Sequence, residues 1–197
     1  MVLMNDHSII FFQINPPVNM KKQSVLAICM LFIFMQCWLL NSSSQSVSKK
    51  ILQYQCLPCG YDCDKEVYDK PGMCSSCHMK LVDKSTVAIK NIRPDEICQY
   101  INHHPGIVLL DVRTKEEFDG KANPNFGGLK NAINIPVQEL ESRIASISNL
   151  KSKEILVFCS HSHRSPQATY LLMQNGFQNV KNMAGGMSVM HDESCKK

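Results

Sequence analysis

The segment that decides the fold is residues 154–167, EILVFCSHSHRSPQ. A short apolar run at residues 155–158 ends at Cys159, and Ser165 and Pro166 follow a five-residue loop. Serine is a favoured helix N-cap, and proline is favoured at the first helical position. The segment therefore predicts a strand, a tight loop and a helix that begins after Ser165, with a thiol at the carboxyl end of the strand.

The loop that follows Cys159 has the chemistry of an anion site. A loop above a helix N-terminus directs backbone N–H groups and the positive end of the helix dipole toward its centre, which favours a thiolate or a bound anion. The alternative is an inert cysteine at the end of a core strand. We expect a reactive Cys159, with Arg164 as a fixed positive charge. The expected anion-binding loop comprises Ser160, His161, Ser162, His163 and Ser165.

Composition restricts the classes of function. The chain has 197 residues, a net charge of +4 and 7% aromatic residues. Because no basic run accompanies this charge, we expect no nucleic-acid partner. Five of the ten cysteines lie within residues 56–77, which indicates a local metal or disulfide cluster.

The N-terminal region predicts export. Residues 1–19 form an irregular extension, and residues 20–48 have the order of a signal peptide and linker, with Met20 as the initiator, two lysines and then an apolar run. Two alternatives stay open: residues 24–40 remain as a membrane anchor, or Cys37 is lipidated, which fits least well. We expect a periplasmic protein that meets a membrane only if this leader is retained.

Residues 54–82 predict a small metal-binding module. Cys56 and Cys59 form one C-x-x-C pair, and Cys74 and Cys77 form another. Two such turns can close a tetrahedral four-thiolate site, and a segment this short needs a metal to hold its fold. We expect zinc or another soft metal, copper included, with disulfides as competitors after export. The spacing leaves open the roles of three further residues: Cys63, His78 and Met79.

The same segment resembles the heavy-metal-binding domain of bacterial copper efflux proteins. The matching residues are Tyr54, Cys56, Lys70, Pro71, Gly72, Cys74, Cys77, Met79, Leu81 and Val82. The family usually has Cys-Pro-Met-His at its first turn, where this chain has residues 56–59, CLPC. It usually has glycine where His78 stands. These departures make the module more similar to a zinc ribbon than to a copper carrier.

Residues 85–191 predict an α/β domain. Strands are expected at residues 87–89, 107–112, 132–135, 155–159 and 180–183. Helices are expected at residues 94–102, after a capping box at residues 114–117, at residues 137–147, and from Ser165 to about residue 175. Alternating strands and helices favour a parallel sheet, whose sites lie at the carboxyl ends of the strands. Residues 192–197 form a polar tail, which we expect to be mobile.

The order of motifs in this domain resembles a rhodanese domain. The matching segments are residues 110–113 (LDVR), 116–118 (EEF), 132–136 (AINIP), 157–159 (VFC), 164–165 (RS), 176–177 (GF) and 184–187 (AGGM). The chain departs from the family at Ser162, where glycine is common, in the loop at residues 127–132, and at Met187 and Met190, where aromatic residues are usual. These departures bear on the substrate rather than on the fold.

The resemblance implies a sulfurtransferase. Cys159 would attack the sulfane sulfur of a small anion such as thiosulfate, become a persulfide and pass that sulfur to a thiol or to cyanide. Arg164 would attract the anionic donor, and Asp111 would support the loop or pair with a nearby base. Sulfur transfer of this kind needs no cofactor.

Three alternatives stay open. A cysteine phosphatase needs arginine six residues after its nucleophile. Arg164 stands at position five, so the loop is one residue short for phosphate, which favours sulfur. A non-catalytic heavy-metal-binding protein would use the cysteine module beside an inert rhodanese-like domain. In a third hypothesis, the module positions or protects the persulfide on Cys159. In an oxidising space, Cys159 could also pair with Cys98 or Cys195.

Overall fold

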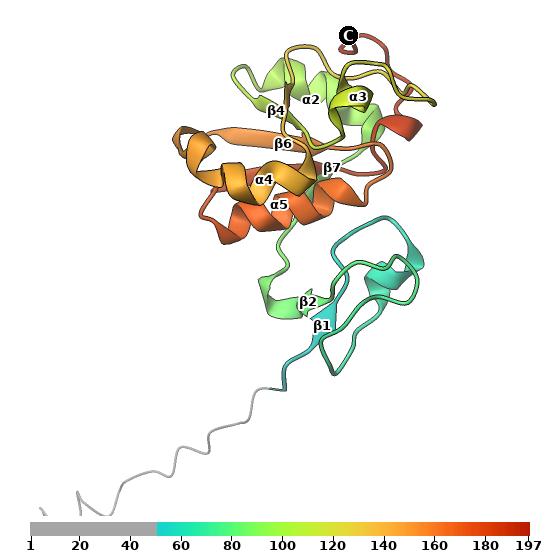
Figure 1. The fold of residues 1–197 in the computed structure, drawn as a ribbon, viewed down its shortest axis with the longest axis vertical. Helices are drawn as coiled ribbons and strands as arrows, with labels where there is room; N and C mark the ends of the chain where they lie inside the picture. The colour runs from blue at the N-terminus through green and yellow to red at the C-terminus, as the bar shows by residue number, and fades with distance from the viewer. Residues whose placement is uncertain (1–50) are drawn as a thin grey trace, which may run out of the picture. The chain divides into compact units, whose positions relative to one another are not determined.

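The computed structural model describes residues 51–197. The predicted leader, anchor and lipidation site therefore lie outside the described residues. Within the described part of the chain, no helix is long and apolar enough to cross a membrane. These residues form a larger α/β domain and a small cysteine-rich module with a two-stranded sheet (Figure 1).

The larger domain is built on a five-stranded sheet in which every pair of neighbouring strands is parallel. Its spatial order is β3-β7-β6-β4-β5. The strands are β3 (Lys90–Ile92), β4 (Val108–Asp111), β5 (Ile133–Asn134), β6 (Glu154–Phe158) and β7 (Asn179–Met183). The predicted parallel α/β fold is confirmed, and β6, the strand that leads to Cys159, is the central strand.

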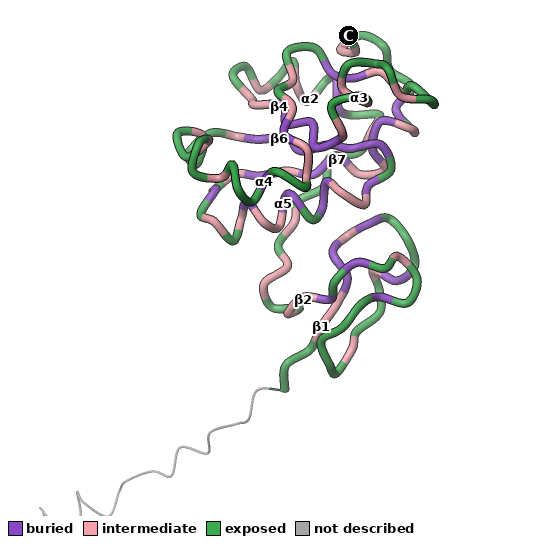
Figure 2. The backbone as a smooth tube through the Cα atoms, in the orientation of Figure 1, coloured by how far each residue is buried: buried purple, intermediate pink, exposed green. Residues whose placement is uncertain are grey.

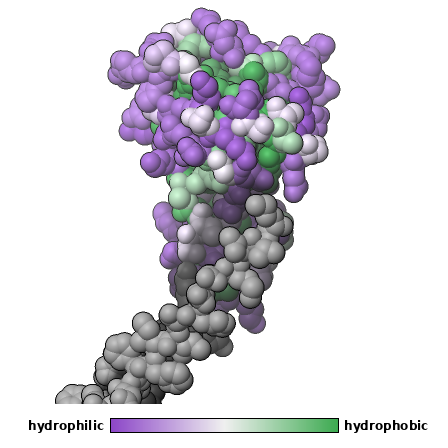
Figure 3. Space-filling view, turned by 90° about the vertical axis from the view of Figure 1, so that its left-hand side faces the viewer, coloured by the Kyte–Doolittle hydropathy of each residue, from purple (hydrophilic) through white to green (hydrophobic). Residues whose placement is uncertain are grey.

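Alternate residues of β6 supply the cores on the two faces of the sheet. Ile155, Val157 and Cys159 pack with α4 (Val137–Arg143) and α5 (Arg164–Gln174). Leu156 and Phe158 pack with α2 (Ile97–His103) on the opposite face. Figure 2 shows the resulting buried layer along β6, and Figure 3 shows mainly hydrophilic residues outside it, with small hydrophobic groups between them. The period-two pattern therefore places Cys159 on the α4/α5 face.

Most of the predicted helices are present, with shifted ends. The capping box is confirmed: Thr114 caps α3 (Lys115–Phe118), and Glu117 completes the box. α2 follows a 3-10 turn, η3 (Pro94–Glu96), and α4 continues into a 3-10 segment, η4 (Ile144–Leu150). The first strand was predicted at residues 87–89, but β3 lies three residues later, where it can pair with β7.

The predicted start of α5 is wrong. The helix begins at Arg164 with His163 as its N-cap, rather than after Ser165. Pro166 is tolerated inside the first turn because the N–H groups there have no partner within the helix. Arg164 therefore belongs to the helix that follows the loop.

The C-terminal tail is tied to the domain, which corrects the expectation of a mobile segment. Cys195 forms a disulfide with Cys98 of α2. The Lys130 N–H donates to the carbonyl of Cys195 at 3.0 Å, and the Lys197 N–H donates to the carbonyl of Gly128 at 2.8 Å. Cys159 is a free thiol, so the open possibility that it pairs with Cys98 or Cys195 is not realised in this structure.

The cysteine-rich module has little regular structure. Strands β1 (Tyr54–Gln55) and β2 (Val82–Asp83) form an antiparallel pair that joins its two ends. A 3-10 turn, η1 (Asp62–Lys65), follows the first cysteine pair, and another, η2 (Lys84–Thr86), follows β2. An isolated bridge between Met73 and Lys80 closes the loop that carries the second cysteine pair.

Candidate active site and metal centre

Cys159 lies at the carboxyl end of the central strand, as predicted. It is 1% exposed. Its Sγ donates to Oγ of Ser165 in the first turn of α5, over 3.3 Å. The thiol therefore lies at the base of the loop, held between the end of β6 and the start of α5.

The residues after β7 fix the backbone of this loop. The carbonyl of Cys159 accepts the N–H of Met187 at 2.8 Å, and the carbonyl of Ser160 accepts the N–H of Ser188 at 3.0 Å. Gly186 makes this approach possible, because a Cβ there would collide with the Ser160 carbonyl and lie 2.7 Å from the Cys159 carbonyl oxygen.

The N–H groups of the loop differ from its carbonyls in their hydrogen bonding. Among residues 51–197, no backbone acceptor pairs with the N–H groups of Ser160, His161 and Ser162. Ser162 has a φ of 61°, which explains the family's preference for glycine at this position. Ser160 and Ser162 are buried, whereas His161 is exposed to solvent. Because buried N–H groups without a partner are uncommon, those of Ser160 and Ser162 favour an anion as their partner.

Glu117 joins α3 to the loop, a role that the sequence did not reveal. Its carboxylate receives both guanidinium nitrogens of Arg164, with Nη1···Oε2 at 2.6 Å and Nη2···Oε1 at 2.8 Å. The Ser160 hydroxyl donates to the same carboxylate at 2.6 Å. Glu117 thus holds both ends of the loop.

This pair also fixes the charge state of its members. The hydrogen bond from Arg164 lowers the pKa of Glu117 to about 2, against the opposing effect of burial. The same carboxylate raises the pKa of Arg164. The Glu117 carboxylate compensates the charge of the Arg164 guanidinium. The main effect of Arg164 is therefore to hold the conformation of the loop, through its bonds to Glu117.

Asp111 and Arg113 form a second, fully buried ion pair beneath the site. Arg113 is 1% exposed and Asp111 is 0% exposed. Arg113 Nη2 donates to Asp111 at 2.7 Å and to the carbonyl of Gly127 at 2.8 Å. The pair therefore links the end of β4 to the long loop before β5. Of the two roles expected of Asp111, the structure shows the pairing with a nearby base.

The two histidines of the loop contact aromatic rings. The His161 ring meets Phe126 edge-on, with ring centroids 5.1 Å apart, and the His163 ring lies 5.2 Å from Tyr61. These contacts account for the orientation of both rings without a hydrogen bond to Cys159.

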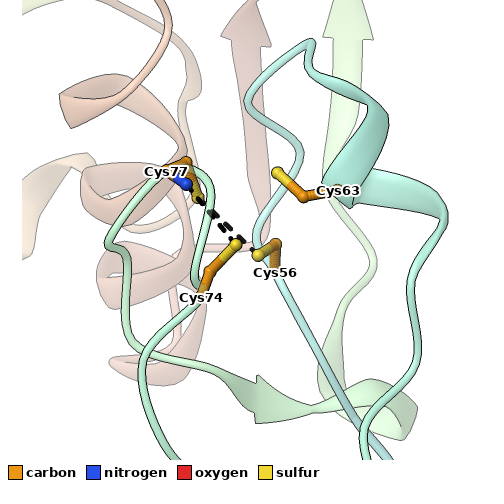
Figure 4. A group of neighbouring side chains, drawn as sticks. All are labelled: Cys56, Cys63, Cys74 and Cys77. Atoms are coloured by element: carbon orange, nitrogen blue, oxygen red, sulfur yellow. Dashed lines mark hydrogen bonds between the residues drawn. The ribbon is translucent and has the colours of Figure 1, made fainter.

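The cysteine module gathers four sulfur atoms into one cluster. The sulfurs of Cys56, Cys63, Cys74 and Cys77 lie within 4.8 Å of one another (Figure 4). The prediction had Cys59 in place of Cys63. The structure instead groups Cys59 with Cys63 and Asp64. The two C-x-x-C pairs do not include Cys63. The sequence feature that could have indicated Cys63 as a ligand is its position four residues after Cys59.

The donor chemistry of this cluster fits a thiophilic metal ion. The Cys77 N–H donates to Cys74 Sγ at 3.5 Å. Burial would raise the pKa of Cys74, but hydrogen bonds from the Cys77 N–H, Cys56 and the Ser76 N–H lower it to about 6. Burial raises the pKa of Cys63 to about 11. Metal binding requires thiolates, and the hydrogen bonds to Cys74 already favour that form.

The two remaining residues of this module have structural roles. Met79 is 4% exposed and belongs to the module's core, so its side chain packs there. His78 has a φ of 57°, so it occupies a turn position for which glycine is suited. Neither residue is grouped with the four sulfurs.

Comparison with known proteins identifies the larger domain. A family model described as "Rhodanese-like domain" matches residues 94–193, half of the chain. The chain belongs to the rhodanese-like domain family. The match covers the loop at Cys159, Glu117 and the disulfide partner Cys98.

The relatives of this rhodanese-like domain include both longer proteins and a shorter one. An "Adenylyltransferase and sulfurtransferase UBA4" of Candida glabrata is 38% identical over 40% of this chain and 19% of its own length. A "tRNA uridine(34) hydroxylase" of Cytophaga hutchinsonii is 27% identical over 55% of this chain and 34% of its own length. A "Sulfurtransferase" of Allochromatium vinosum is 26% identical over 50% of this chain and 85% of its own length. The chain thus spans about a fifth of the length of the first relative and about a third of the second.

A solved structure, a rhodanese-like domain protein of Staphylococcus aureus, is also similar. It is 27% identical, covers 54% of this chain and 96% of its own, and gives a TM-score of 0.46. Together with the sulfurtransferases among the relatives, the family supports sulfur-transfer chemistry in general.

Proposed function

We propose that this protein is a sulfurtransferase in which Cys159 carries a sulfane sulfur as a persulfide. The observation that carries the proposal is the loop at Cys159. Hydrogen bonds from residues 187–188 fix the carbonyls of Cys159 and Ser160, while three N–H groups of the loop have no backbone partner among residues 51–197. This arrangement suits an anionic persulfide and an anionic donor.

The proposed reaction has two displacement steps. The Cys159 thiolate attacks the outer sulfur of thiosulfate, the S–S bond of thiosulfate breaks, and sulfite leaves with the electron pair. A thiolate or cyanide then attacks the terminal sulfur of the persulfide and regenerates the Cys159 thiolate. The transfer needs no external oxidant or reductant.

Arg164 has a modified role in this proposal. Its guanidinium is bound by Glu117, so the loop N–H groups provide most of the attraction for the donor. Arg164 and Glu117 hold the loop in the shape that presents these groups.

The cysteine module is proposed to hold a soft metal through Cys56, Cys63, Cys74 and Cys77. Such an ion would join the two halves of the module as a structural centre. The spacing and burial of the sulfurs support zinc, with copper as an alternative. Export to the periplasm remains our proposal from residues 20–48.

Intact-mass spectrometry of the full chain, before and after thiosulfate, tests the sulfurtransferase. We expect a gain of one sulfur that disappears with cyanide and is absent in Cys159→Ser. If a folded, reduced chain gains no sulfur, the heavy-metal-binding protein with an inert rhodanese-like domain becomes the better proposal. Metal retained by Cys159→Ser would show that the module works independently of the loop.

A further inference from the structure

The cysteine module contains more ligands than one tetrahedral ion requires. Besides the four-sulfur cluster, ligand atoms of Cys59, Cys63 and Asp64 form a second group within 4.8 Å of one another. Cys63 belongs to both groups. Figure 4 shows its sulfur directed from η1 toward the sulfurs of the first group.

The sulfur spacings in both groups match metal coordination. Two sulfurs on one tetrahedral zinc ion lie about 3.8 Å apart, because each Zn–S bond is about 2.3 Å long. In the first group, Cys56 Sγ and Cys77 Sγ are 3.7 Å apart. In the second group, Cys59 Sγ and Cys63 Sγ are also 3.7 Å apart. Each group therefore contains one edge of a possible coordination tetrahedron.

Asp64 is fixed beside the sulfur of Cys59. Its Oδ1 accepts the backbone N–H of Cys59 at 3.0 Å and lies 3.1 Å from Cys59 Sγ, while Oδ2 accepts the N–H of Gly60 at 2.8 Å. Cys59 is 3% exposed. A preoriented carboxylate next to a buried thiol is a suitable oxygen ligand for zinc.

We propose that the module binds two soft divalent ions, bridged by the sulfur of Cys63. The first ion is held by the four-sulfur cluster, and the second by Cys59, Cys63, Asp64 and a solvent molecule. The second ion offsets the negative charge that four thiolates leave around the first. This inference rests on the proposed four-sulfur site, but not on sulfur transfer at Cys159.

Cadmium provides a direct test, because it is a thiophilic divalent ion with an observable nucleus. The reduced, metal-free full chain is titrated with ¹¹³Cd²⁺, and native mass spectrometry and ¹¹³Cd NMR follow binding. We expect two ions in the module, with two resonances that split each other through the shared sulfur. Cys59→Ala should lose one ion and the splitting, while the remaining resonance shows that the module still folds. In Cys159→Ala, the control outside the module, both ions should remain.

The possible outcomes distinguish failure of the bridged pair of ions from failure of the four-sulfur site. A single module ion that survives Cys59→Ala and is lost in Cys74→Ala would overturn the bridged pair alone. Two resonances without mutual splitting would also overturn it. If the module binds no cadmium in the wild-type chain, both the bridged pair and the four-sulfur site are wrong, and the persulfide test at Cys159 is unaffected.

Discussion

Glu117 is a residue outside the loop at Cys159 that contacts both of its ends. It completes the capping box of α3 and binds Arg164 and Ser160 at the two ends of the loop. One carboxylate therefore couples a local helix signal to a contact across the domain. A change at this residue should affect the loop without removing any atom near the thiol.

We expect Glu117→Gln to lower the stability of the protein in a pH-dependent way. Glutamine can keep the capping box but not the charge. Because the pKa of Glu117 falls from 4.5 to about 2 on folding, its stabilisation is complete above about pH 5 and is lost as the pH falls toward 2. The free energy of unfolding should differ between variant and wild type by about 2 kcal/mol at pH 6 and by less at pH 3. Urea titrations at both pH values measure this, and an equal difference at both would contradict the ion pair.

Gly186 is the second residue with a specific prediction. In Gly186→Ala, the new Cβ collides with the Ser160 carbonyl, and the residue has a φ of 75°. The expected cost is about 3 kcal/mol or more, together with loss of sulfur loading on Cys159. Gly106→Ala is the matched control, because its φ is 91° and nothing lies within 4 Å of the added Cβ. Equal losses of stability in the two variants would show that contact with the loop is unimportant.

At the scale of elements, the parallel sheet and its crossovers decide where the chemistry lies. β6 is the middle strand of the order β3-β7-β6-β4-β5, and the turn after β7 supplies the N–H groups that fix the loop after β6. Neighbouring parallel strands end at the same edge of the sheet, so their following turns meet there. The loop at Cys159 is thus held by two adjacent strand ends and by α3.

The disulfide between α2 and the tail should stabilise the domain. Cys98 and Cys195 are 97 residues apart in the sequence, so their bond strongly restricts the unfolded chain. Cys195→Ser should lower the free energy of unfolding by about 2–4 kcal/mol. Urea unfolding with and without reductant tests this, since reductant should weaken the wild type and leave the variant unchanged. A variant as stable as the oxidised wild type would refute the prediction.

At the scale of the whole molecule, the two parts differ in what holds them together. The rhodanese-like domain has two apolar clusters, one on each face of its sheet. Cysteines make up four of the seven buried residues in the core of the cysteine module. A core of that composition is too small to stabilise a fold without a metal.

Metal removal should therefore affect the two parts differently. After chelation, we expect amide hydrogen exchange in residues 54–82 to become fast, while β4 and β6 keep their protection. Hydrogen exchange with mass spectrometry, before and after chelator, measures this, and re-addition of zinc should restore protection. Unchanged exchange in the module would argue against a structural metal, and loss of protection in β6 would show that the domain depends on it.

The sequence by itself determined the local elements and their order. Apolar runs, the capping box at Thr114 and the strand–loop–helix at Cys159 predicted a parallel α/β domain, because these signals depend only on neighbouring residues. The ends of the elements were less certain: Pro166 indicated a helix start, but α5 begins two residues earlier.

Only the tertiary structure decided which distant residues meet. Arg164 binds Glu117 across 47 residues, Cys98 pairs with Cys195, and Cys63 rather than Cys59 joins the four-sulfur cluster. The spacing of the cysteines allowed either choice, and hydrogen bonds from Cys59 and Gly60 to Asp64 set the path that brings Cys63 inward. Such pairings depend on how packed elements approach one another, which local sequence patterns do not specify.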